Sequence, residues 1–163
     1  MTVTVRKMEP GDWARVAEIY RQGIAEGRST FRTECPSFEA FDAGHWQKCR
    51  FVAEAEGVVA GWCTLAPVSS VEAYRGVAEV SVYVDADYRR RGIGAELLRR
   101  LCEESEEQGF WCLYSSIFSA NAASVDLHKK CGFREIGYRE KIARDRFGNW
   151  QSTTVMEYRN AIE

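Results

Sequence analysis

Residues 77–109 read VAEVSVYVDADYRRRGIGAELLRRLCEESEEQG, and this stretch contains the transition that decides the fold. Val77–Val84 is rich in β-branched and aromatic residues and predicts a strand. Apolar residues then recur at helical spacing from Leu97 to Cys102, charged residues occupy the other side, and Gly109 is a typical helix end. The stretch therefore predicts a strand, an arginine- and glycine-rich loop, and a long amphipathic helix.

The loop between this strand and helix has the composition of an anion site. The first amide N–H groups of a helix lack acceptors inside the helix, and glycine lets the backbone approach a ligand closely. Together with the helix dipole and nearby arginines they suit a diphosphate, although a solvated strand-to-helix turn would have the same composition. The sequence matches neither a Walker A loop nor a dinucleotide-binding turn. The candidate phosphate-binding residues are Arg89, Arg90, Arg91, Gly92, Ile93, Gly94 and Ala95.

On both sides of this stretch, the patterns predict alternating strands and helices without repeats or linkers. The order strand, two helices, three strands, helix, strand, helix and two strands predicts a mixed α/β sheet with helices packed on it. Residues 1–163 are therefore expected to form a single domain. The expected elements are strands near 2–8, 51–55, 58–68, 77–84, 110–118, 134–142 and 152–158, and helices near 10–24, 37–48, 93–108 and 121–131.

Composition excludes several classes of protein. With 45% hydrophobic and 28% charged residues and a net charge of −2, the chain lacks the basic excess of a nucleic-acid-binding protein. No window is long and apolar enough for a membrane span, and the first residues lack the apolar segment of a signal peptide. We therefore expect a cytoplasmic protein without a nucleic-acid or membrane partner.

The cysteines and histidines do not predict a metal site. The six cysteines include no C-x-x-C pair, and there are two histidines, His45 and His128. Cysteines in apolar stretches such as GWCTL and FWCLY are expected to be small buried hydrophobic residues in a reducing compartment.

Two motifs together resemble a known family. The run VYVDADYRRRGIGA at residues 82–95 looks like the acetyl-CoA-binding signature of GNAT acetyltransferases, and NAASVDLHKKCGF at residues 121–133 resembles the later motif of that family. The resemblance implies the GNAT fold, an α/β fold with a mixed, mostly antiparallel central sheet of about six or seven strands flanked by about four helices. It also implies acetyl-CoA as cosubstrate and no metal.

The likeness extends over nearly the whole chain to one branch, the phosphinothricin and methionine sulfoximine N-acetyltransferases, which also acetylate arsinothricin. The branch markers are TFRTE at residues 30–34, EVSVYV at 79–84 and FGNW at 147–150. The chain differs from the branch at Cys35-Pro36, at Val80 and at residues 151–153, which leaves the identity of the acceptor open.

Glu79 is the candidate general base. Free amines are mostly protonated at neutral pH, so acetyl transfer benefits from a base near the amine. A carboxylate in an otherwise apolar strand is costly unless it is paired or used, and the resembling branch has its base at this position. The alternative is an outward-facing carboxylate or an ion-pair partner of an arginine.

His128 is the second candidate catalytic residue. It occupies the position where many GNAT enzymes have a tyrosine that protonates the departing thiolate, and the resembling branch has a histidine there. A histidine could donate that proton or help to deprotonate the amine. The alternative is a histidine that packs the helix.

The resemblance also implies contacts for the pantetheine arm and the acceptor. Family members separate the fourth and fifth strands so that pantetheine binds like a partial strand. Tyr74 and Arg75 lie in a loop that flanks the acceptor cleft in the resembling enzymes, whereas Asn121 could equally be only a helix cap. The implied cofactor contacts are Val82, Tyr83, Val84, Asn121, Ser124 and Lys130, and the implied acceptor contacts are Phe31, Arg32, Thr33, Tyr74 and Arg75.

The predicted function is transfer of an acetyl group from acetyl-CoA to the amine of a small amino-acid-like acceptor. Two alternatives stay open, a protein or peptide N-terminal acetyltransferase and a non-catalytic acetyl-CoA-binding module, because fold alone does not determine function. The resemblance further suggests a homodimer, with which the aromatic-rich final strands are compatible.

Overall fold

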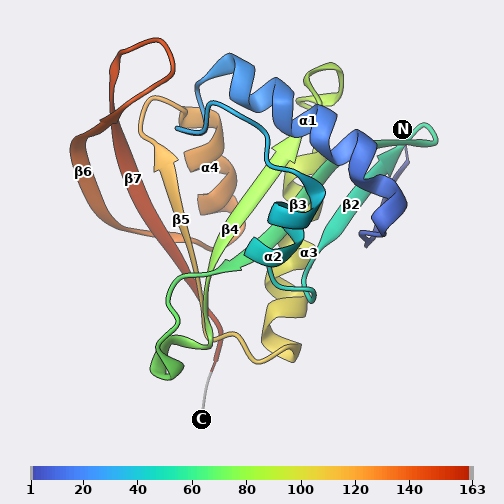
Figure 1. Cartoon of the computed structure of the whole chain (residues 1–163). Coiled ribbons are helices and arrows are strands. Elements are labelled where there is room, and N and C mark those ends of the chain that lie inside the picture. Colours follow the sequence, from blue (N-terminus) through green and yellow to red (C-terminus); the bar gives the residue numbers. More distant parts are fainter. Residues whose placement is uncertain (1, 162–163) are drawn as a thin grey trace.

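The computed structural model describes residues 2–161 and contains a seven-stranded sheet in the order β1-β2-β3-β4-β5-β7-β6 (Figure 1). Neighbouring strands are antiparallel except β4 and β5, which are parallel. The mixed, mostly antiparallel α/β sheet expected from the sequence is confirmed. The strands are β1 (Val3–Lys7), β2 (Phe51–Ala55), β3 (Val58–Pro67), β4 (Val77–Val84), β5 (Cys112–Phe118), β6 (Arg134–Arg144) and β7 (Trp150–Arg159). The α-helices are α1 (Trp13–Glu26), α2 (Phe38–Gly44), α3 (Ile93–Glu107) and α4 (Ala122–Lys130), and the 3-10 helices are η1 (Pro10–Asp12), η2 (Glu72–Tyr74) and η3 (Ala86–Tyr88).

The helices cover both faces of the sheet. Figure 1 shows α1 and α2 in front of the strands and α3 behind them. On the front face, Ile19 and Tyr20 of α1 pack with Phe41 of α2 on Trp62 of β3. On the opposite face, α3 packs over β2, β3 and β4 and against α4.

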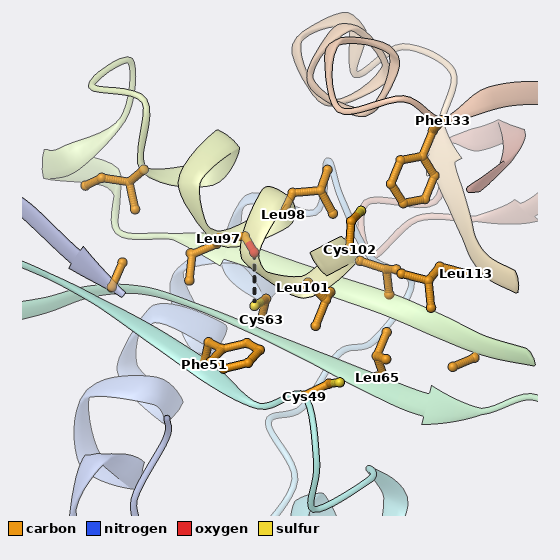
Figure 2. Close-up of a cluster of buried hydrophobic side chains, with 14 of the residues drawn as sticks. Cys49, Phe51, Cys63, Leu65, Leu97, Leu98, Leu101, Cys102, Leu113 and Phe133 are labelled. Carbon is orange, nitrogen blue, oxygen red and sulfur yellow. Dashed lines mark hydrogen bonds between the residues drawn. The ribbon is translucent and has the colours of Figure 1, made fainter. Parts of the chain in front are cut away.

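The core beneath α3 comes from the apolar stripe that the sequence predicted. Leu97, Leu98 and Leu101 are fully buried, and Figure 2 shows them with Cys63, whose Sγ lies 3.7 Å from the Leu97 carbonyl oxygen. Truncation of such a leucine to alanine costs about 2–5 kcal/mol. α3 therefore holds the middle of the sheet rigidly.

All six cysteines are free thiols, as expected for a chain without a disulfide framework. Four of them are buried, and Cys35 and Cys131 are half-buried. Burial raises the pKa of the Cys49 thiol to about 11 and that of Cys102 to about 12. The buried thiols therefore stay protonated at neutral pH and act as small hydrophobic side chains.

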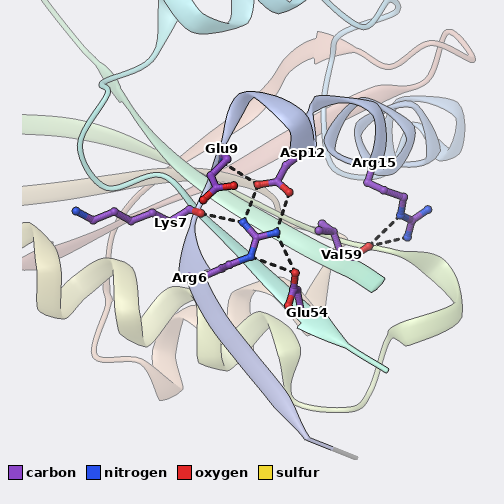
Figure 3. Close-up of polar contacts among 7 residues, drawn as sticks. All are labelled: Arg6, Lys7, Glu9, Asp12, Arg15, Glu54 and Val59. Carbon is purple, nitrogen blue, oxygen red and sulfur yellow. Dashed lines mark hydrogen bonds and ion pairs between the residues drawn. The ribbon is translucent and has the colours of Figure 1, made fainter. Parts of the chain in front are cut away.

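An arginine network ties the N-terminal strand to its neighbours (Figure 3). The Arg6 guanidinium donates to both carboxylate oxygens of Asp12, each at 2.8 Å, and to Oε1 of Glu54. This pairing holds the pKa of Asp12 below its usual value. On α1, Arg15 donates to the Val59 carbonyl oxygen at 3.0 and 2.7 Å, which fixes the helix against β3.

Two helix boundaries differ from the sequence prediction. The residues from Pro10 form a 3-10 turn, and the α-helix begins at Trp13. α2 begins after its predicted cap, Ser37, but ends at Gly44 instead of near Lys48. The reason is Arg50, which donates to the carbonyl oxygens of Asp42, His45 and Trp46 and so stabilises an extended chain after the helix.

Candidate active site

The parallel strands β4 and β5 separate part-way along their length. They pair only from Val77–Cys112 to Glu79–Tyr114, although β4 continues to Val84 and β5 to Phe118. On their outer sides, β4 pairs with β3 and β5 pairs with β7 over these same residues. The facing edges beyond Glu79 therefore carry backbone donors and acceptors outside any strand ladder, which an extended ligand could bind as a partial strand.

A cavity of about 570 Å³ opens at this fork. Small-molecule sites have volumes of about 300–1,000 Å³. Its walls come from the loop between α1 and α2, from β4 and β5, from α4 and from β6. Among the predicted site residues, the cavity is lined by Phe31, Arg32, Glu79, Val82, Tyr83, Asn121, Ser124 and His128.

Glu79 lies at the fork itself, as the last β4 residue that pairs with β5. Its side chain is half-buried and lines the cavity. Tyr114, its partner on β5, also lines the cavity, and burial together with the Glu79 carboxylate raises the pKa of Tyr114 to about 12. Tyr114 therefore stays a neutral phenol beside the carboxylate.

Tyr83 is packed beneath α1. Its ring stacks on Trp62 with centroids 4.9 Å apart and contacts Tyr20 at 5.0 Å. Burial raises its pKa. A Cβ on Gly23 of α1 would lie 2.8 Å from the Tyr83 ring, so the glycine is required for this close approach. This packing fixes β4 where it borders the fork.

His128 of α4 is a buried polar residue of the cavity wall. The residue is 4% exposed, and its Nδ1 lies 2.7 Å from the Ser124 carbonyl oxygen. Because a carbonyl can only accept, Nδ1 carries the proton, and Nε2 of the neutral ring has a free lone pair. Among residues 2–161, Nε2 has no hydrogen-bond partner although it is buried. Burial lowers the pKa of His128, which favours this neutral form.

The predicted phosphate-binding loop leads into α3. Gly92 is the N-cap residue with a left-handed φ of 80°, and Arg90 also has a positive φ of 63°. The amides of Ile93, Gly94 and Ala95 lie in the first turn, where a helix offers no internal acceptor. Such first-turn amides are suited to an anion.

The arginines of this loop are not equivalent. Arg89 forms an ion pair with Glu26 at 2.6 Å, whereas Arg91 lies 3.5 Å from Glu56 and over the Tyr88 ring. The loop is therefore braced against α1 and against the β2–β3 turn.

Asn121 and Ser124 enter the cavity wall from the start of α4. Asn121 is the N-cap residue, and its Oδ1 accepts from the Ser124 amide at 3.2 Å. The cap interpretation of Asn121 is thus correct, and the residue lines the cavity as well. Lys130 is the last residue of α4 and is exposed outside the cavity.

The predicted acceptor residues divide into two groups. Phe31 and Arg32 line the cavity, and the Phe31 ring lies 4.5 Å from that of Phe118. Thr33 is exposed beyond the wall. Tyr74 and Arg75 lie before β4, at the end where β4 and β5 are still paired, and so outside the cavity.

Arg75 instead lines a second hollow of about 330 Å³ and stacks over Trp111 at 5.3 Å. Tyr74 is exposed on the surface. The flanking-loop interpretation of these two residues therefore does not hold for the cavity of this chain.

Sequence reasoning missed most of the other residues of the cavity wall, and among them are Tyr114, Arg139 and His45, whose side chains can ionise. Arg139 lies on β6, opposite Thr153, which in turn is opposite Phe118. Directly opposite residues of antiparallel strands share a face, so this row brings Arg139 to the cavity. The alternation of FWCLYSSIF could have indicated Tyr114, whereas Arg139 needs the strand register.

Comparisons with known proteins agree with this architecture. Residues 13–133 match the family described as Acetyltransferase (GNAT) family. The chain belongs to this family. The family, the fold and the use of acetyl-CoA expected from the sequence are thereby confirmed.

Two relatives indicate the branch. The chain is 36% identical over 104 residues to a Pseudomonas aeruginosa L-methionine sulfoximine/L-methionine sulfone acetyltransferase, covering 64% of this chain and 60% of the relative's length. It is 32% identical to the phosphinothricin N-acetyltransferase of Streptomyces viridochromogenes, covering 91% of this chain and 86% of that enzyme.

Two solved structures have the same fold over nearly the whole chain. A Sinorhizobium meliloti phosphinothricin acetyltransferase in complex with acetyl-CoA has a TM-score of 0.89 at 28% identity, covering 98% of this chain and 89% of that one. A Brucella melitensis protein described as a ribosomal-protein-alanine N-acetyltransferase has a TM-score of 0.87 at 29% identity, covering 96% of this chain and 99% of that one.

Within residues 2–161, no helix is long and apolar enough to cross a membrane. The same residues include no group of three or more His, Cys, Asp or Glu side chains suited to a metal ion.

Proposed function

We propose that this chain transfers an acetyl group from acetyl-CoA to the amine of a small amino-acid-like acceptor. The observation that carries the proposal is the position of Glu79 at the fork between β4 and β5. A pantetheine arm bound along the free strand edges would reach toward the carboxylate at the point where the strands meet. The rest of the same cavity, which Glu79 also lines, has room for a small amine.

Different residues would bind the different parts of acetyl-CoA. The amides of Ile93, Gly94 and Ala95 would bind the diphosphate. The backbone of Val82 and Val84 would hold the pantetheine amides, while Asn121 and Ser124 border the arm from α4. Acetyl-CoA supplies an acetyl thioester, which is activated toward amines.

Two side chains handle the acceptor's proton. Glu79 would attract the ammonium form of the acceptor and accept a proton from it, which leaves the amine lone pair free. His128 presents a neutral Nε2 lone pair, so in this form it accepts rather than donates a hydrogen bond. We therefore assign Glu79 as the base that accepts the first proton of the ammonium group. As the amine nitrogen bonds to the acetyl carbon and the C–S bond breaks, Nε2 of His128 would accept the second proton and pass it to the CoA thiolate that leaves.

Thiol release from acetyl-CoA, with mass spectrometry of the product, tests the proposal on phosphinothricin, methionine sulfone, methionine sulfoximine and a peptide with a free N-terminus. Saturable acetylation of the amino acid analogues is expected, and Glu79→Gln should lower kcat about 100-fold or more with acetyl-CoA binding intact. Wild-type kcat in Glu79→Gln from pH 6 to 9 would disprove the base.

His128→Asn is the matched variant for the second residue. Asparagine keeps a donor near the position of Nδ1, and so the bond to the Ser124 carbonyl, but has no counterpart of Nε2. It should lower kcat and flatten the pH dependence on the acidic side without changing the affinity for acetyl-CoA.

A peptide N-terminal acetyltransferase is the second candidate, favoured by the similarity to the Brucella protein. The limited volume of the cavity, whose wall includes the Phe31 and Phe118 rings in contact with each other, favours a small acceptor over a chain. Acetylation of the peptide alone would establish this alternative, and acetyl-CoA binding without any turnover would indicate a binding module.

We also propose that the protein works as a homodimer. β6 is an edge strand whose large apolar side chains are exposed, with Ile136 at 47%, Tyr138 at 60% and Ile142 at 48%. An exposed apolar edge strand can associate with another chain, and proteins normally cover such a surface. Light scattering is expected to give twice the chain mass for the wild type and the chain mass for Ile136→Asp.

We place this activity in the cytoplasm, where acetyl-CoA is available and where the six free thiols would stay reduced. The expected physiological role is resistance to amino-acid antimetabolites. Expression in a phosphinothricin-sensitive bacterium should raise the tolerated concentration, and the Glu79→Gln variant should not.

A further inference from the structure

The charges in the cavity wall do not balance. Apart from histidines, its acidic and basic side chains are Glu79, Arg32 and Arg139. The two histidines of the wall, His45 and His128, are both held toward the neutral form because burial lowers their pKa values. The wall therefore carries two cations and one anion before an acceptor enters.

Neither guanidinium forms an ion pair in the part of the chain that the structure describes. Arg32 and Arg139 have no carboxylate partner among residues 2–161, whereas arginines elsewhere, such as Arg6 and Arg89, are paired. An unpaired guanidinium that borders a binding cavity is suited to a carboxylate or to another oxyanion.

The two arginines reach the cavity from different elements. Arg32 follows Phe31 in the loop before α2, and its charge acts on Tyr20, which also experiences the charge of Glu79. Arg139 is aligned across the sheet with Thr153 of β7 and Phe118 of β5. Phe118 is four residues along β5 from Tyr114, the partner of Glu79, which separates the two backbone positions by about 13 Å. Arg139 lines the same cavity as Tyr114.

An acceptor that matches all three charges has one cation and two anions. Its ammonium group would lie at Glu79, and the α-carboxylate, one carbon away from the nitrogen, would lie near Glu79 and at Arg32. A second anionic group at the end of the side chain would then lie farther from Glu79, toward Arg139.

Building on the proposed function, we propose that Arg139 selects acceptors with an anionic side chain, so that this chain prefers dianionic amino acids over neutral ones. The class includes amino acids that end in a phosphinate, a phosphonate or a carboxylate.

Phosphinothricin and methionine sulfone form a matched test pair. They differ in the terminal group, an anionic methylphosphinate in one and a neutral methylsulfone of nearly the same shape in the other. The wild type is expected to have a kcat/KM about tenfold higher for phosphinothricin than for methionine sulfone, since one charge-assisted hydrogen bond at an open site is worth about that factor. L-glutamate and L-glutamine provide a second pair with the same difference in charge.

Arg139→Gln is expected to remove this preference by lowering kcat/KM for phosphinothricin about tenfold, with methionine sulfone changed less than about twofold. Arg32→Gln should lower both, because both acceptors have an α-carboxylate. Arg144→Gln is the control, since Arg144 lies on the same strand, stacks on Trp150 and does not line the cavity.

Equal loss on both acceptors in Arg139→Gln, or a wild type that prefers methionine sulfone, would overturn the role of Arg139 and leave the acetyltransferase proposal standing. Absence of turnover with every amine would instead overturn the proposed function itself.

Discussion

Asp85, which follows β4, joins the proposed phosphate-binding loop to α1, and its removal gives a quantitative test of the structure. The side chain is 5% exposed and accepts from Arg15 at 2.9 Å, Gln22 at 3.1 Å and the Asp87 amide at 2.8 Å. The residue therefore connects α1 to η3, from which the loop leads to the N-terminus of α3. The perturbation we choose is Asp85→Ala.

The expected loss can be worked from these contacts. Removal of one partner of a buried ion pair costs about 3–5 kcal/mol. Arg15 keeps its bonds to the Val59 carbonyl oxygen and to Glu18, and it is 28% exposed, which places the cost at the lower end. We expect Asp85→Ala to lower the free energy of unfolding by about 3 kcal/mol.

Urea unfolding at pH 7 measures this loss, with Asp87→Ala as the control. Asp87 is exposed and receives no side-chain ion pair in the described part of the chain, so its removal should cost less than about 0.5 kcal/mol. A loss below about 1 kcal/mol for Asp85→Ala, or an equal loss for both variants, would refute the reasoning.

The same variant has a defined pH dependence. Burial alone raises the pKa of Asp85, but the hydrogen bonds from Asp87, Gln22 and Arg15 outweigh it and lower the pKa below its ordinary value of 3.8. A lowered carboxyl pKa stabilises the fold above the unfolded-state value, and this stabilisation is lost as the pH falls through the folded-state pKa. The difference between wild type and Asp85→Ala should therefore shrink below about pH 4.

Three further predictions follow from individual contacts. A Cβ on Gly94 would lie 3.1 Å from Cδ2 of Leu127, so Gly94→Val should raise the Kd for acetyl-CoA about tenfold or more in a fluorescence titration, and an unchanged Kd would argue against the loop as the diphosphate site. Burial raises the pKa of Cys63 strongly, so Ellman's reagent should modify this thiol only after unfolding, and rapid labelling of the native protein would contradict its packing. Burial lowers the pKa of His128, so the unfolded state binds the proton more readily and stability should fall as the pH drops below about 6.5; His128→Asn should reduce this decline, and identical pH profiles would show that His128 is not the cause.

Local signals in the sequence predicted the elements that border the site. The β-branched run before Asp85 and the leucine stripe from Leu97 gave β4 and α3 because each pattern matches the periodicity of its element. The two-residue interval between the predicted strands 51–55 and 58–68 is a tight hairpin turn, in which Glu56 and Gly57 both adopt positive φ, 55° and 77°.

The early end of α2 was not predictable in the same way. It depends on Arg50, which donates to three carbonyl oxygens in the last turn of the helix and just after it. Neither residue spacing nor helix propensity indicates such a contact. Likewise, η1 forms because Glu9 and Asp12 make a reciprocal capping box, which separates Pro10 from the α-helix that follows.

The cavity residues that lie in recognisable motifs were predictable. Those that only the strand register brings to the cavity were not. Glu79 and His128 were found from the resemblance, and the cavity brings both together. Arg139 lies on an exposed strand without any distinguishing pattern, and only the pairing of β5 with β7 and of β7 with β6 places it on the cavity face. Tyr74 and Arg75 differ in the opposite direction, since the resemblance implied that they flank the acceptor cleft, whereas they do not line this cavity.

A crystal structure of the protein with acetyl-CoA would test the central claim most directly. We expect the diphosphate on the amides that begin α3, the pantetheine amides hydrogen-bonded to the backbone of Val82 and Val84, and the thioester at the fork within reach of Glu79 and Nε2 of His128. Binding of acetyl-CoA away from the fork, or a thioester on the far side of β4 from Glu79, would contradict the account.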